Sequence, residues 1–85
     1  MVKKWIKQLI LLEKTTNIDF DTIIFDILSW NYEKYDQKEL TWYNNLYRVR
    51  VWWYRIIFRN EKNNIKILLV WTRGSVYKQL KTMFW

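Results

Sequence analysis

The chain has no cysteine and no histidine, and it has only one glycine in 85 residues. Without cysteine there is no disulfide, which fits a reducing compartment, and we expect a cytoplasmic protein. Without either residue type there is no zinc site of Cys and His and no acid–base chemistry on an imidazole. Any chemistry must therefore rest on other side chains.

Long apolar runs are also missing. No stretch reaches the roughly 18 apolar residues that a membrane span needs. The start, MVKKWIKQLILLEK, places charges before apolar residues, but charge returns at Glu13 and Lys14 and no small-residue cleavage site follows. We interpret it as part of the fold and not as a signal peptide.

The net charge of +7 is concentrated in the second half of the chain. Residues 1–40 have six lysines and seven acidic residues, which gives −1, and residues 41–85 have five arginines, four lysines and one acidic residue, which gives +8. A basic half next to a near-neutral half suggests a polyanionic partner, such as nucleic acid or the ribosome. The alternative is a basic surface that only keeps the protein in solution.

Two helices are predicted first. Apolar residues recur at helical spacing over 2–14 and again over 19–30, where Asp19 is the predicted N-cap. The segment 31–45 is polar, aromatic and aperiodic, so we predict a loop there.

From Leu46 onward the apolar period falls to two. It predicts strands over 46–51, 54–59 and 65–71, the last apolar on both faces and therefore expected at the centre of the sheet. Ser75 is the predicted cap of a short final helix. The whole predicts one α+β domain over 1–85: two N-terminal helices, a small antiparallel sheet of three or four strands and a short C-terminal helix, with the helices packed on one face of the sheet.

Arginines line one predicted face of this sheet. Strand alternation places Arg48 and Arg50 together, and Arg55 follows just across the turn. Arg73 comes after the third strand, and Tyr77 lies four residues later. Several guanidiniums beside a phenol suit the binding of phosphates and the stacking of bases. An ordinary solvated strand face is the structural alternative.

The stretch LYRVRVWWYRIIFR followed by ILLVWTRGSVYK resembles the RelE/ParE toxin superfamily of type II toxin–antitoxin systems. In that superfamily a Tyr-Arg-apolar-(Lys/Arg) strand is followed by a glycine-containing turn and a Tyr-Arg-apolar-apolar-(Tyr/Phe) strand. An arginine follows the third strand, and Val-Tyr comes a few residues later. The resemblance covers residues 40–79, and residues 1–30 match only as two helices. The first strand usual in the family has no visible counterpart.

The resemblance implies a RelE-like mRNA interferase, which cuts mRNA in the ribosomal A site through attack by the RNA's own 2′-OH, with no metal or other cofactor. Carried over by position, Arg55 and Arg73 would clamp the phosphate, Tyr77 would stack on a base or orient the 2′-OH, and Arg48 and Arg50 would line the RNA groove. Relatives have lysines where this chain has Arg48 and Arg50. Arginine is a poor base, so cleavage here would rest mainly on positioning and electrostatics.

Two alternatives stay open at this point. ParE relatives share the fold and inhibit DNA gyrase without cutting RNA, and a third class would be an inactive member that only binds RNA or a partner. The order of Arg73 and Tyr77 favours the nuclease. The resemblance also implies a small cognate antitoxin, besides the ribosome and mRNA. Trp42, Tyr43 and Trp85 are candidates for the antitoxin interface, and core packing would explain them equally well.

Seven tryptophans and one glycine invert ordinary usage, in which glycine is about 7% of residues. Trp30, Trp42 and Trp52 stand where glycine is expected: after the second helix, in the loop before the first strand, and at the hairpin turn. One hypothesis is that the gene uses UGA for glycine and that these codons are rendered here as tryptophan. The other is a protein truly rich in tryptophan, with a wider hairpin loop.

Overall fold

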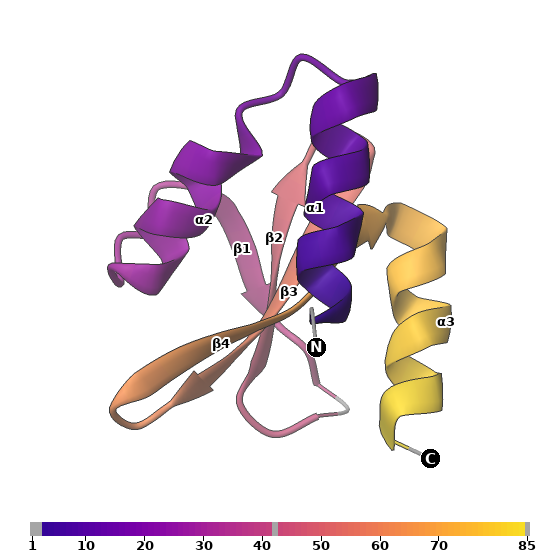
Figure 1. Cartoon of the computed structure of the whole chain (residues 1–85). Helices are drawn as coiled ribbons and strands as arrows, with labels where there is room; N and C mark the ends of the chain where they lie inside the picture. The colour runs from indigo at the N-terminus through magenta and orange to yellow at the C-terminus, as the bar shows by residue number, and fades with distance from the viewer. Residues whose placement is uncertain (1–2, 42, 85) are drawn as a thin grey trace.

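The computed structural model describes residues 3–41 and 43–84 and contains three helices and four strands. The strands form one antiparallel sheet in the order β1-β2-β3-β4 (Figure 1). This α+β architecture confirms the predicted fold class. The elements, in chain order, are α1 (Lys4–Thr15), α2 (Phe20–Leu28), β1 (Asp36–Glu39), β2 (Leu46–Val51), β3 (Tyr54–Glu61), β4 (Asn64–Thr72) and α3 (Arg73–Phe84).

Asp19 caps α2 as the sequence predicts. Its carboxylate accepts hydrogen bonds from the Thr22 backbone N–H at 3.1 Å and from the Thr22 hydroxyl at 2.6 Å. These bonds satisfy a donor that the first helical turn leaves unpaired, and they hold the pKa of Asp19 below its usual value. The cap thereby fixes where α2 begins.

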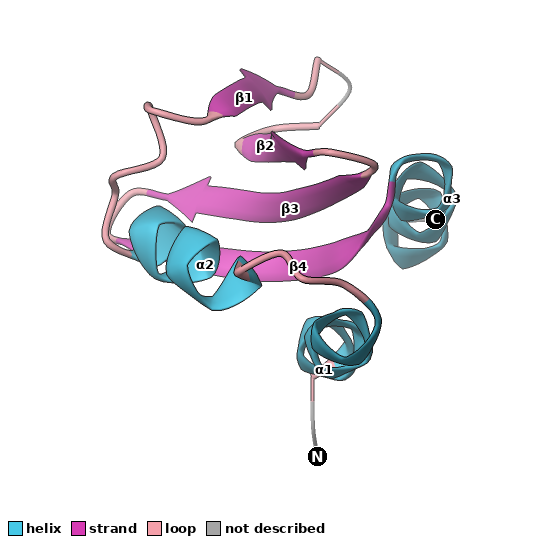
Figure 2. Ribbon diagram, turned by 90° about the horizontal axis from the view of Figure 1, so that it is seen from above, coloured by secondary structure: helices cyan, strands magenta, loops and turns pink. Residues whose placement is uncertain are grey.

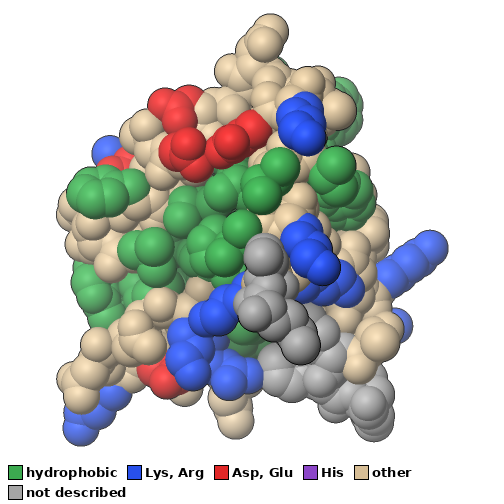
Figure 3. All heavy atoms as spheres, in the orientation of Figure 1, with side chains coloured by type: hydrophobic (Ala, Val, Ile, Leu, Met, Phe, Trp, Pro, Cys, Tyr) green, Lys and Arg blue, Asp and Glu red, His purple; other side chains and the backbone are tan. Residues whose placement is uncertain are grey.

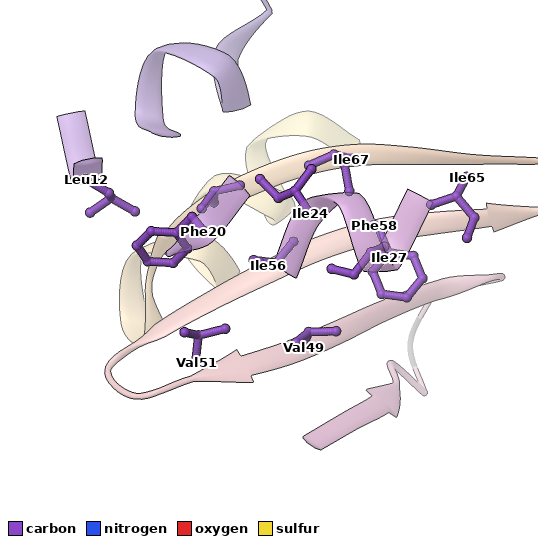
Figure 4. Close-up of a cluster of buried hydrophobic side chains, with 11 residues drawn as sticks. Leu12, Phe20, Ile24, Ile27, Val49, Val51, Ile56, Phe58, Ile65 and Ile67 are labelled. Carbon is purple, nitrogen blue, oxygen red and sulfur yellow. The ribbon is translucent and has the colours of Figure 1, made fainter. Parts of the chain in front are cut away.

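The main core lies between α1, α2 and one face of the sheet. Phe20, Ile24 and Ile27 of α2 pack over Ile56 and Phe58 of β3 (Figure 4). The buried members of this cluster are Leu12, Phe20, Ile24, Ile27, Val49, Val51, Ile56, Phe58, Ile65, Ile67 and Val70. The period-two pattern of β2 and β3 therefore sends its apolar residues toward the two N-terminal helices.

The C-terminal helix packs on the opposite face, so the expectation that all helices share one face is wrong. Val76 and Leu80 of α3 are buried against Leu46, Ile57 and Leu69. Because neighbouring residues of a strand point to opposite faces, Ile57 faces away from the main core, to which Ile56 and Phe58 belong. Figure 2 shows α3 where β4 ends, separate from α1 and α2.

The strand over 64–72 is not central either: β4 is an edge strand. It is apolar on both faces because α1 covers one of them and α3 the other. The ladder shifts register between Ile57 and Phe58, so that Ile57 pairs with Leu69 while Phe58 pairs with Ile67. This bulge leaves Leu68 as an extra residue and lets Ile67 and Leu69 face different cores.

The predicted loop 31–45 contains a strand. β1 pairs with β2 over four residues, from Asp36 opposite Arg50 to Glu39 opposite Tyr47. Its side chains are mostly exposed, so it has no apolar alternation that could signal a strand. The backbone ladder and the charges of β2 hold it in place.

The last helix starts earlier than predicted. α3 begins at Arg73, so Ser75 lies inside the helix and its hydroxyl accepts a hydrogen bond from the Gln79 side chain at 2.9 Å. In the part of the chain that the structure describes, no helix combines the length and the apolar character needed to cross a membrane.

Candidate functional site

Arg48, Arg50 and Arg55 lie near one another on the face of the sheet that carries α3. Arg50 pairs directly with Arg55 across the β2–β3 ladder, and Arg48 lies two residues before Arg50 on the same face. Like charges opposite each other on a sheet repel, so this arrangement works against stability. A face that gathers cations in this way is suited to an anionic ligand. We call Arg48, Arg50 and Arg55 the arginine face.

Arg73 joins two of these arginines around a surface hollow of about 250 Å³. The hollow is lined by Arg50, Trp52, Trp53, Arg55 and Arg73, and we call it the arginine hollow. Arg73 reaches this place because α3 begins there: its backbone N–H donates to the Trp53 carbonyl at 2.9 Å. The sequence predicts these three arginines as site residues, and the fold brings them to one cavity.

Arg55 is the buried member of the group, with 6% of its surface exposed. Its Nη1 donates to the carbonyls of Trp52 at 3.2 Å and Tyr54 at 2.9 Å, so the guanidinium braces the hairpin turn. Burial lowers its pKa. Tyr77 raises that pKa, while Arg50, Arg48 and Arg73 lower it. The other four predicted site residues thus all influence the Arg55 guanidinium.

Tyr77 and Arg48 lie in a second hollow of about 230 Å³, which we call the tyrosine hollow. Tyr77 is half-buried on the first turns of α3. The other residues that line it are Lys38, Glu39, Leu40, Thr41 and Tyr43. The five predicted residues are therefore divided between two hollows, and the arginine face connects them.

Two charged residues of β1, Asp36 and Lys38, lie against Arg48 at the candidate site and were missed by the sequence analysis. Asp36 lies 3.7 Å from Arg48 Nη1 and 3.9 Å from Arg50 Nη1, which are ion-pair distances too long for hydrogen bonds. Lys38 pairs with Arg48 in the ladder and lines the tyrosine hollow. Nothing in the polar stretch DQKE signals a strand, so neither residue could be placed on this face from the sequence.

Arg48 keeps an unused donor. Its Nη1 is buried and makes no hydrogen bond with any residue the structure describes. A buried donor without a hydrogen bond is unfavourable, and here the Asp36 carboxylate at 3.7 Å offsets only its charge. Within residues 3–41 and 43–84 no three acidic side chains gather as a metal site. The arrangement can bind an anion and stabilise charge that develops on it.

Of the aromatic residues considered for a partner surface, Tyr43 is half-buried at the tyrosine hollow and packs against the α3 core. Trp42 and Trp85 lie outside the described residues.

No protein-family model matches the sequence, and no curated protein sequence matches it. The fold is similar to a chain in the crystal structure of the RelB-RelE antitoxin-toxin complex from Methanococcus jannaschii, with a TM-score of 0.69 and 26% identity. The match covers 92% of this chain and 94% of that one. This likeness supports the view that the chain is a member of a toxin–antitoxin system of the RelB–RelE type.

Proposed function

We propose that this chain is the toxin of its pair and that it is a RelE-like, ribosome-dependent endoribonuclease. The observation that carries the proposal is the gathering of Arg50, Arg55 and Arg73 around one hollow, with Arg48 and Tyr77 in the next. RNA presents a phosphate at every nucleotide and a base beside it. Guanidiniums recognise the phosphate, and an aromatic ring such as that of Tyr77 can stack on the base.

The reaction that suits these residues is an internal transesterification. The 2′-oxygen of the RNA attacks the adjacent phosphorus, the bond from phosphorus to the 5′-oxygen breaks, and a 2′,3′-cyclic phosphate and a 5′-hydroxyl result. Negative charge grows on the phosphate oxygens during attack. Arg73 and Arg50, at the mouth of the arginine hollow, would stabilise that charge, and Arg55 would add to the positive potential from behind them.

The proton of the 2′-OH needs an acceptor, and arginine is too weak a base to take it. Lys38 is the lysine in the tyrosine hollow, beside Arg48 and Tyr77. Solvent takes the 2′-OH proton, and the Lys38 ammonium, which can donate a proton where a guanidinium cannot, is our candidate for the acid that protonates the departing 5′-oxygen. Tyr77 would position the nucleotide whose 2′-OH reacts.

The test is cleavage of a defined mRNA on programmed ribosomes, with the new ends mapped. We expect wild-type protein to cut in the A site, and Arg73→Ala to lower the single-turnover rate about 100-fold, as the loss of one charge-stabilising donor does. Tyr77→Phe and Lys38→Ala should lower the rate while ribosome binding is retained. Lys62→Ala, which removes a cation from the β3–β4 turn, is the control and should cleave normally.

A wild-type protein that leaves mRNA intact on ribosomes but inhibits DNA gyrase would overturn this proposal in favour of the ParE-like activity. Neither activity, with RNA binding retained, would point to an inactive member of the fold.

The partner we propose is a small acidic antitoxin. Charge complementarity would seat its acidic segment on the arginine face. α1 and α2 offer a second contact, because Ile10, Leu11, Phe25 and Leu28 are large apolar side chains that stay exposed there. Figure 3 shows hydrophobic side chains gathered on the face that carries these helices, with basic side chains below them. Co-purification with the product of the adjacent gene tests this. An unchanged complex in Phe25→Asp would exclude α2 from the contact.

A further inference from the structure

We propose that residues 30 and 52 are glycine in the protein that the source cells make, because its gene specifies both with UGA codons read as glycine. The proposal holds whichever activity the chain has. It rests on two backbone positions that the fold holds in a glycine conformation and that this sequence fills with tryptophan.

The first position is the β2–β3 hairpin. Val51 pairs with Tyr54, so the loop contains only Trp52 and Trp53, and the wider loop that would accommodate a real tryptophan pair is not formed. Trp52 has φ 55°, and Trp53 is not left-handed. A left-handed first residue followed by an ordinary second one is the sign pattern of a type II′ turn, which takes glycine at its first central position.

The second position is the end of α2. The Asn31 N–H donates to the Asp26 carbonyl at 2.7 Å and the Trp30 N–H donates to the Ile27 carbonyl at 3.0 Å. These two bonds, with Ser29 as the C-cap, define a Schellman motif whose C′ residue is Trp30. That residue has φ 67°, and C′ of this motif is usually glycine because no Cβ then opposes the left-handed backbone.

Among the residues that the structure describes, one further residue with a side chain is left-handed, and it provides an internal reference. It is Asn45, with φ 63°, and asparagine enters this region several times more often than other residues with a side chain. For a bulky side chain the same region is a genuine outlier. Gly74, in contrast, lies inside α3 and has no positive φ. The lone glycine is thus not where the backbone needs it, and two tryptophans are.

Glycine at position 52 also changes the candidate site. The Trp52 indole is 75% exposed and forms part of the wall of the arginine hollow. Without it, that hollow is wider, and Arg50 and Arg73 are easier for an extended polyanion to reach. If the proposed function holds, Trp52→Gly should bind RNA more tightly than the chain with tryptophan.

The decisive experiment is the peptide mass of the protein isolated from its own cells, together with the codons of the gene. We expect UGA at positions 30 and 52 and peptides with the mass of glycine at both. UGG at either position, or a peptide with the mass of tryptophan, overturns the proposal.

Recombinant variants test the backbone argument separately. Trp52→Gly and Trp30→Gly should each raise Tm by about 4–8 °C, the shift that relief of a left-handed side chain produces in a domain of this size. Trp52→Ala removes the indole but keeps a Cβ, and it should recover much less. Trp53→Gly is the matched control: its side chain is 79% exposed in the same turn without positive φ, so it should not raise Tm. A Trp52→Gly protein no more stable than Trp52→Ala would contradict the proposal. RNA binding does not enter this readout, so its outcome is independent of the proposed function.

Discussion

The two faces of the sheet are built from opposite kinds of side chain. The face under α1 and α2 is apolar along β2, β3 and β4, and helices cover it. The other face is apolar only beneath α3, and its β2 half carries Arg48 and Arg50, with Arg55 opposite on β3. The first face supplies most of the buried core, whereas the second accepts like-charge repulsion that folding does not require. That difference is the reason we propose the functional site on the arginine face.

The largest effect should follow from Phe58→Ala. Phe58 is fully buried in the covered face and its ring stacks on Tyr47 with centroids 5.5 Å apart. Truncation of a buried phenylalanine costs about 3–5 kcal/mol, a large part of the stability of a domain this small. Urea denaturation measures it. The control is Arg50→Ala on the other face, which we expect to change the free energy of unfolding by less than about 0.5 kcal/mol. Equal losses for the two variants would contradict the division between the faces.

A smaller effect is expected from Gln8→Leu, because Gln8 connects the two sides at the edge of the sheet. Its buried side chain accepts a hydrogen bond from the Val70 N–H at 2.9 Å. The same amide donates a hydrogen bond to the Gln79 side-chain oxygen of α3 at 2.8 Å. Loss of the amide leaves a buried N–H without a partner, which costs about 1–3 kcal/mol. Gln79→Leu keeps the Val70 bond and should cost less. If Gln79→Leu cost as much in urea denaturation, the Val70 bond would not be the important one.

On the arginine face, Asp36→Asn should strengthen RNA binding. Asp36 offsets the charges of Arg48 and Arg50 at long ion-pair distance, and it is more than half exposed. Exposed pairs contribute up to about 1 kcal/mol, so we expect an affinity gain of roughly fivefold or less. The gain should shrink as salt is added. Filter binding at two salt concentrations measures it. Asp21→Asn on α2 removes one negative charge at a place away from this face. An equal gain in RNA affinity for this variant would show that the effect comes from net charge alone.

The smallest effect concerns how stability depends on pH, through a carboxylate on the side of the sheet that α1 and α2 cover. The Asp26 carboxylate of α2 accepts a hydrogen bond from the Tyr35 hydroxyl and lies 3.0 Å from Lys34 Nζ. These contacts, the Tyr35 bond first, hold the pKa of Asp26 below its usual value. Burial and the same bond raise the pKa of Tyr35 to about 12.

A carboxyl whose pKa is lower in the folded state adds stability above its unfolded pKa of about 4, and that stability is lost as pH falls through the folded value. We therefore expect Tm to drop below about pH 4 in the wild type and to drop less steeply in Asp26→Asn. Thermal unfolding between pH 7 and pH 3 checks this. Parallel curves for the two proteins would rule Asp26 out as a source of the acid sensitivity.

The sequence predicted those features that depend on a local period. Alternation along β2 placed Arg48 and Arg50 on one face, and helical spacing with Asp19 as cap located α2. Features that depend on neighbours in space were missed. β1 is four polar residues held by their ladder to β2, so Asp36 and Lys38 were not assigned to the site.

The position of β4 was mistaken for a related reason. A strand apolar on both faces is usually central, but here two helices from opposite ends of the chain cover an edge strand. The apolar pattern of a strand does not show whether the strand lies between two other strands or at an edge with a helix packed on each face.

The bond between the Arg73 N–H and the Trp53 carbonyl makes the hairpin tip a support for the last helix. Residues 53 and 73 are far apart in sequence. The position of the Trp53 carbonyl nevertheless determines where α3 begins, and therefore where the Arg73 side chain leaves the backbone. A change in the turn that moves this carbonyl would therefore also move the first turn of α3, so the shape of the hairpin and the position of Arg73 are coupled.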